Sequence, residues 1–137
     1  MVGEVRVSAP RTVTEAEIVA FAREYDPQYF HADPEAAKDH LFGGVAASGI
    51  HTMAIWRQLD HQIAGDVRWI CGVGWENVRW AHALYPEDTV RARWELLSKR
   101  DSSKPGRGVV EVDYGLLNQR DQFVFRCCST NLVEKRP

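Results

Sequence analysis

The sequence is poor in features that mark several classes of protein. Its three cysteines, Cys71, Cys127 and Cys128, are an odd number without the spacing of a disulfide framework or a zinc site, and we interpret them as buried apolar residues. None of the five histidines pairs with a cysteine or a carboxylate at a recognised metal-ligand spacing. The sequence therefore predicts no metal site and no disulfide-stabilised scaffold.

The chain also lacks an excess of charge of one sign and any long apolar run. Lysine and arginine number 17 against 19 aspartates and glutamates, which gives no electrostatic reason to expect nucleic acid as a partner. No segment is apolar enough for a signal peptide or approaches the roughly 20 apolar residues that span a bilayer. We therefore predict a cytoplasmic protein with no membrane partner.

What is present indicates one domain over residues 1–137. With 45% hydrophobic residues the chain has enough apolar side chains for a single core, and no repeat or linker divides it.

A capping box at Thr14–Glu17 predicts a helix from about Glu15 to Tyr25, which Asp26-Pro27 would end. A second start signal at 33–38 predicts a short helix, so that Pro27 to Ala32 would be a loop between two helices.

The rest of the chain predicts one buried helix followed by strands. The segment VAASGIHTMAIWRQL, residues 45–59, has the small and apolar positions of a helix buried around much of its circumference. Alternating apolar positions separated by turn residues then predict four strands, at residues 73–80, 89–98, 108–118 and 123–132. The predicted class is α+β, with an antiparallel sheet wrapped around a long central helix.

An acid and an imidazole, Asp26 and His31, stand five positions apart in the predicted loop. If the loop curls, both can hold one water, with the carboxylate accepting a proton and the imidazole giving or taking one. The alternative is that Asp26 only ends a helix and His31 packs beneath the loop, and the spacing alone favours this alternative.

Glycines and small residues precede the central helix, and among them Ser48 and Gly49 are candidates for binding a substrate. Free backbone N–H groups at a helix N-terminus favour negative charge, so the N–H of Gly49 could stabilise the oxyanion of a thioester. Close packing of the helix against the sheet explains the small residues equally well. A nucleophilic role for Ser48 is the weaker hypothesis, because the GxSxG context is missing.

The segment DPQYFH, residues 26–31, followed by the Gly49 segment, resembles the signature of the MaoC-like dehydratases, which are (R)-specific enoyl-CoA hydratases of the hotdog fold. Residues 79–90 and 103–110 resemble further segments of the same family, so the resemblance covers most of the chain. It implies a hotdog fold and, since hotdog domains generally pair their sheets edge to edge, a homodimer or a higher homo-oligomer.

The signature is not fully kept. Gln28 and Tyr29 replace the usual Asn and Pro, Ser48 stands where many members have a histidine, and Asp26 and His31 are retained. The departures leave the fold and the reaction class as the resemblance implies them, and they bear on the choice of substrate.

The resemblance implies reversible hydration of a trans-2-enoyl-CoA to an (R)-3-hydroxyacyl-CoA. Asp26 and His31 would activate the water, the N–H of Gly49 would stabilise the thioester oxygen, and no cofactor would be needed beyond the CoA of the substrate. The bulky Trp56 and Arg57 on the central helix predict that short or medium acyl chains are preferred.

Two other functions fit the same fold. A hotdog acyl-CoA thioesterase normally uses an acid or a polar residue on the central helix, where this chain offers Ser48, His51 and Thr52 but no acid before Asp60. A non-catalytic subunit that binds acyl thioesters would have lost the acid or the imidazole, and this chain has both.

Overall fold

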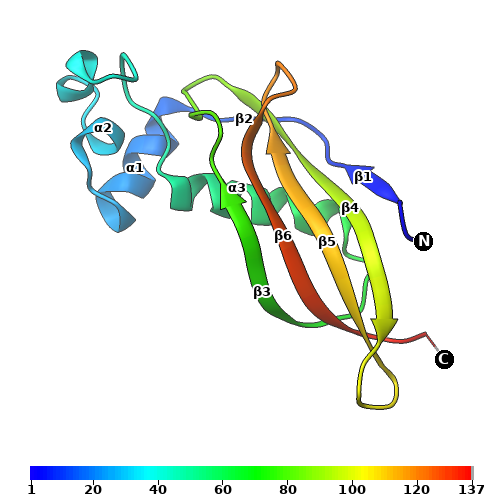
Figure 1. Cartoon of the computed structure of the whole chain (residues 1–137). Coiled ribbons are helices and arrows are strands. Elements are labelled where there is room, and N and C mark those ends of the chain that lie inside the picture. Colours follow the sequence, from blue (N-terminus) through cyan, green and yellow to red (C-terminus); the bar gives the residue numbers. More distant parts are fainter. Residues whose placement is uncertain (137) are drawn as a thin grey trace.

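An antiparallel sheet of six strands forms one side of the structure, and the helix α3 lies across it, with α1 and α2 gathered near the N-terminal end of α3 (Figure 1). The computed structural model describes residues 1–136. The strand order is β1-β4-β5-β6-β3, and β2 also pairs with β4. The elements in chain order are β1 (Val5–Val7), β2 (Arg11–Thr12), α1 (Glu15–Tyr25), α2 (Tyr29–Ala32), the 3-10 helix η1 (Ala36–Asp39), α3 (Gly49–Ile63), β3 (Trp69–Arg79), β4 (Thr89–Asp101), β5 (Arg107–Leu117) and β6 (Phe123–Glu134).

Local signals set the bounds of α1 as predicted. The side chain of Thr14 accepts a hydrogen bond from the backbone N–H of Glu17 at 3.2 Å, which caps the helix. The helix ends at Tyr25, and the N–H of Asp26 closes it on the carbonyl of Ala22 at 2.8 Å. The carboxylate of Asp26 is thereby placed at a fixed helix end.

The prediction of a loop from Pro27 to Ala32 is wrong, because this stretch contains the single helical turn α2. The carbonyl of Gln28 accepts from the N–H groups of His31 and Ala32 at 2.9 and 3.0 Å, so the turn closes directly after the proline. The second start signal is confirmed, since the carboxylate of Asp33 accepts the N–H groups that begin η1. His31 therefore projects from a hydrogen-bonded turn.

The central helix α3 begins at Gly49 and not at Val45 as predicted. Residues 45–48 form a buried segment outside the helix, in which the N–H of Ala46 donates to the carbonyl of Phe30 at 3.1 Å. Because a distant part of the chain makes this bond, small apolar residues alone could not distinguish the segment from helix.

The side of α3 that faces the sheet forms the core. Ile55, Trp56 and Leu59 are buried, and the ring centroid of Trp56 lies 4.8 Å from that of Phe125 on β6. The opposite side is open, with Ile50 56% exposed, so the predicted burial around much of the circumference is limited to the side that faces the sheet. Among residues 1–136 no helix is both long and apolar enough to cross a membrane.

The four predicted strands are present and correspond to β3–β6. The predicted starts of β4 and β6, Thr89 and Phe123, are confirmed, and the other ends differ from the prediction by one to four residues. The strands β1 and β2 were not predicted, because they have three and two residues and both pair with the distant β4. The 11-residue β3 lies at the edge of the sheet, and no other strand of the described chain pairs with its outer side (Figure 1).

The cysteines differ from one another in burial. Cys127 is buried as predicted, and burial raises the pKa of its thiol to about 12, so the thiol stays protonated at neutral pH. Cys128 is half-buried. Cys71 is exposed, so the prediction is wrong for it, because it lies on the open edge strand β3.

Candidate active site

The carboxylate of Asp26 is held by a serine from the start of α3. The hydroxyl of Ser48 donates to Oδ2 of Asp26 at 2.8 Å, although the two residues are 22 positions apart. Ser48 is fully buried, and the same hydroxyl accepts the N–H of Ile50 at 3.2 Å as the N-cap of α3. This hydroxyl therefore orients a half-buried carboxylate beside the helix N-terminus.

The imidazole of His31 is buried and anchored to the same segment. Its Nδ1 lies 2.6 Å from the carbonyl oxygen of Ala46. Since a carbonyl oxygen only accepts hydrogen bonds, Nδ1 carries the proton and donates it. In the neutral ring Nε2 is then unprotonated and can accept a proton or orient a water.

Gly49 is the first residue of α3, and an indole covers it. The N–H groups of the first helical turn have no intrahelical acceptor and lie at the positive end of the helix dipole. The indole N–H of Trp80 donates to the carbonyl of Gly49 at 3.1 Å, and a Cβ at Gly49 would lie 3.0 Å from the indole ring. The close contact explains why glycine stands here. Trp80 is therefore part of the site.

A cavity of about 430 Å³ opens beside His31 and Gly49, which both line it. Within the described chain Asp26 does not line this cavity, but its partner Ser48 directly precedes Gly49. Much of the lining is aromatic: Phe30, Phe42 and Trp80. The structure thus brings His31 and Gly49 to one apolar cavity and ties Asp26 to the residue before Gly49.

This arrangement can perform proton transfer beside a polarised carbonyl. It offers an imidazole acceptor, an oriented carboxylate and a helix N-terminus at one end of α3. It does not activate Ser48 as a nucleophile, because the hydroxyl donates to Asp26 and no imidazole of residues 1–136 bonds to it. His51 is buried and stacks on Phe21, with ring centroids 4.4 Å apart, so its ring is used in packing.

Comparisons of the sequence identify relatives over most of the chain. The family model described as MaoC like domain matches residues 2–118. The chain is 32% identical over 126 residues to the uncharacterized protein YdeM of Bacillus subtilis, covering 90% of this chain and 88% of that protein. It is also 32% identical over 104 residues to 3-hydroxyacyl-thioester dehydratase Z of Mycobacterium tuberculosis, covering 74% of this chain and 67% of that protein.

Solved structures show the same fold. The MaoC-like dehydratase from Rhodospirillum rubrum superposes with a TM-score of 0.92 at 39% identity, over 100% of this chain and 94% of that chain. The (R)-hydratase from A. caviae has a TM-score of 0.75 at 18% identity, over 99% of this chain and 97% of that chain, and shows likeness of fold alone. The chain therefore belongs to the MaoC-like dehydratase family and has its hotdog fold.

Proposed function

We propose that the protein reversibly adds water to the double bond of a trans-2-enoyl-CoA and so forms an (R)-3-hydroxyacyl-CoA. Membership of a dehydratase family supports the reaction class, and the similarity to 3-hydroxyacyl-thioester dehydratase Z supports a thioester substrate. The reaction needs no cofactor in this proposal beyond the CoA of the substrate.

In the proposed mechanism Asp26 and His31 hold one water beside C3 of the substrate. The proton on Nδ1 of His31 is held by the carbonyl of Ala46, so Nε2 is the atom that meets the water. The water oxygen bonds to C3, one of its protons passes to the Asp26–His31 pair, and the pair delivers a proton to C2 on the same face. The N–H of Gly49 stabilises the enolate-like oxygen of the thioester while charge builds on it.

One observation carries this proposal. Asp26 and His31 come from different elements, and each is hydrogen-bonded to the short segment 46–48 that leads into Gly49. A residue that only ended a helix would not need a buried serine as partner, and a packing histidine would not need to line the cavity. The contacts therefore support a role for both residues in holding a reacting water.

The thioesterase alternative finds less support. That reaction normally needs an acid or a polar side chain on the central helix to direct a water at the thioester carbon. In the structure the hydroxyl of Thr52 donates to the carbonyl of Ser48 at 3.1 Å. Asp60 lies about three turns beyond Gly49 and pairs with Arg57.

We further propose that the working unit is a homodimer formed through β3. This strand is an unpaired edge of the described sheet, and an exposed edge readily pairs with a second copy of itself about a two-fold axis. Its exposed apolar side chains include Ile70, Val73 and Trp75, which are 40%, 63% and 47% exposed. Light scattering should show a dimer, and a stable monomer at micromolar concentration would contradict the proposal.

We also propose a cytoplasmic location. Cys71, Cys127 and Cys128 are all free thiols in the structure, and unpaired cysteines are typical of proteins in a reducing compartment.

The proposed reaction is tested with crotonyl-CoA and the purified protein. Hydration removes the ultraviolet absorbance of the conjugated thioester without releasing a thiol, and chiral analysis of the product should find the (R) enantiomer. Release of free thiol would instead support a thioesterase. Binding of crotonyl-CoA without either change would support a non-catalytic subunit.

A further inference from the structure

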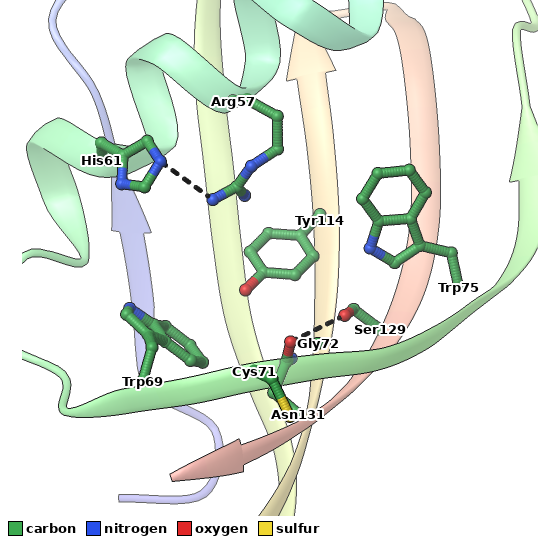
Figure 2. Close-up of a pocket in the computed structure, with 9 residues that line it drawn as sticks. All are labelled: Arg57, His61, Trp69, Cys71, Gly72, Trp75, Tyr114, Ser129 and Asn131. Carbon is green, nitrogen blue, oxygen red and sulfur yellow. Dashed lines mark hydrogen bonds between the residues drawn. The ribbon is translucent and has the colours of Figure 1, made fainter.

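A second cavity of about 230 Å³ lies between the C-terminal half of α3 and the sheet (Figure 2). Arg57 and His61 reach it from the helix, and Tyr114, Ser129 and Asn131 reach it from β5 and β6. The proposed water chemistry does not use it, because Asp26 and His31 lie near the other end of α3.

The two cavities lie along one side of the same helix. Gly49, Met53, Arg57 and His61 are spaced four residues apart, and residues at this spacing lie above one another on a helix surface. Gly49 lines the first cavity, Arg57 and His61 line the second, and the half-buried Met53 stands between them. The rise from Gly49 to Arg57 is about 12 Å. An acyl chain that follows this side of the helix from a thioester at Gly49 would extend toward Arg57.

An unpartnered donor lines the second cavity. Asn131 is only 7% exposed, and its side-chain oxygen accepts the hydroxyl of Ser129 at 3.2 Å (Figure 2). Within the described chain Nδ2 of Asn131 has no hydrogen-bond partner. A buried N–H group without an acceptor is unfavourable, so buried polar groups are nearly always satisfied. An acceptor supplied by a ligand would satisfy this amide.

Arg57 and Tyr114 add further donors. The guanidinium of Arg57 lies over the ring of Trp56 at 4.8 Å and donates to Oδ2 of Asp60 at 3.1 Å. Because a guanidinium has five N–H groups, most of them remain available to a ligand. Tyr114 is buried with its hydroxyl directed into the cavity, and burial raises the pKa of this phenol, so it stays a donor at neutral pH (Figure 2).

Arg57 lines a cavity that no acidic residue of the described chain lines. Asp60 is its ionic partner, but Asp60 is 2% exposed, and burial raises the pKa of its carboxyl despite the opposing effect of Arg57. Nε2 of His61 lies 3.4 Å from a nitrogen of the Arg57 guanidinium, and an imidazole carries no negative charge. The cavity therefore presents more donors and positive charge than acceptors, which suits a ligand group with negatively charged oxygens.

We propose that this second cavity receives the far end of the acyl group and that this end carries a carboxylate. The substrate class is then the CoA thioester of a 2-enoic dicarboxylic acid. This inference rests on the proposed hydratase function and adds the substrate class to it. Arg57 pairs with the carboxylate, and Asn131 and Tyr114 donate to its oxygens. An acyl chain that ends in a methyl group leaves the buried donor of Asn131 without a partner. Unpaired buried donors give a site its strongest discrimination against a substrate analogue.

The test compares saturated acyl-CoA analogues of equal length, so that binding is measured without turnover. Isothermal titration calorimetry gives Kd for adipyl-CoA against hexanoyl-CoA and for suberyl-CoA against octanoyl-CoA. At one length or both, the analogue that ends in a carboxylate should bind roughly tenfold or more tightly, as expected for charge-assisted hydrogen bonds. The corresponding 2-enoyl-CoAs should differ in kcat/KM in the same direction.

Variants of residues that line the second cavity test whether the preference for a terminal carboxylate depends on this cavity. Arg57→Met removes the charge at similar length and should reduce the preference for the carboxylate at least roughly fivefold. Arg91→Met changes an exposed arginine on β4 and should keep the preference of the wild type. If Arg57→Met does not fold, Asn131→Ala provides a second variant, since it removes the unpartnered amide and should also reduce the preference.

The outcomes separate this inference from the proposed function. Equal or tighter binding of the methyl-ended analogues at both lengths would overturn the inference while leaving hydration of crotonyl-CoA intact. The same holds if the preference exists but survives both cavity variants. Binding of none of the four analogues, together with no hydration, would overturn the proposed function and this inference with it.

Discussion

Replacing Ser48 by alanine tests how the proposed site is held together. The hydroxyl makes two hydrogen bonds, one to Asp26 at 2.8 Å and one from the N–H of Ile50 at 3.2 Å. Loss of the N-cap costs about 1 kcal/mol, and loss of a hydrogen bond to a carboxylate costs about 1.5–3 kcal/mol. The free energy of unfolding should therefore fall by about 2–4 kcal/mol, which corresponds to a fall in Tm of roughly 6–12 °C.

Activity should fall as well, because Asp26 loses the group that orients it. A catalytic group displaced by about 1 Å can cost on the order of a hundredfold in rate, so we expect kcat for crotonyl-CoA to fall roughly tenfold to a hundredfold at temperatures where the variant is folded. Thermal unfolding and the absorbance assay on the same preparation measure both effects.

Thr14→Ala is the matched control for this prediction. Thr14 caps α1 as Ser48 caps α3, but the structure gives its hydroxyl no contact with Asp26. It should lower the free energy of unfolding by about 1 kcal/mol and leave kcat unchanged. A Ser48→Ala protein with the kcat of the wild type would refute the argument that the hydroxyl orients Asp26. A fall in Tm no greater than that of Thr14→Ala would show that the bond to Asp26 adds nothing to stability.

Three further predictions concern the helix α3 and the acyl group. Gly49→Ala places a Cβ 3.0 Å from the half-exposed indole of Trp80, so the ring must move; we expect a lower kcat, a change in tryptophan fluorescence and a fall in Tm of only a few degrees, roughly the cost of a small packing strain. Burial raises the pKa of Asp60 above that of the unfolded chain, so its contribution to stability is greatest in acid and is lost as the pH rises through the folded pKa. Asp60→Asn should therefore raise Tm more at neutral pH than in acid, and an equal change at both would contradict this. Trp56 packs between α3 and Phe125 of the sheet and leaves little room for a long acyl group. The value of kcat/KM should therefore be higher for crotonyl-CoA than for a twelve-carbon enoyl-CoA, and the reverse order would show that a long acyl group takes another path.

The sequence predicted elements that depend on neighbouring residues. The helix α1 has its predicted bounds because Thr14 and Glu17 cap one end and Pro27 closes the other. The strands β1 and β2 could not be predicted, because they are short and owe their conformation to pairing with β4, more than 75 positions away. Local chemistry therefore sets the bounds of α1, whereas long-range contacts set β1, β2 and the start of α3.

The site was predictable in its residue types and not in its contacts. Asp26 and His31 could be selected from the signature segment, but their anchors, Ser48 and Ala46, lie 22 and 15 positions away. The indole of Trp80 comes to Gly49 from 31 positions away, and nothing in the local sequence indicates this contact. Such partners are defined by the packing of α1, α2 and α3 together, which residue spacing does not describe.

The central claim is that Asp26 and His31 act together on one water, and crotonyl-CoA hydration by Asp26→Asn, His31→Ala and the double variant tests it most directly. Each single substitution should lower kcat by roughly a hundredfold or more, with much smaller effects on binding of butyryl-CoA. The double variant should be little worse than either single variant, because residues that act as a unit are not additive. If the residues only pack, the substitutions will lower Tm and leave turnover nearly intact, and full turnover by a folded Asp26→Asn protein would contradict the account.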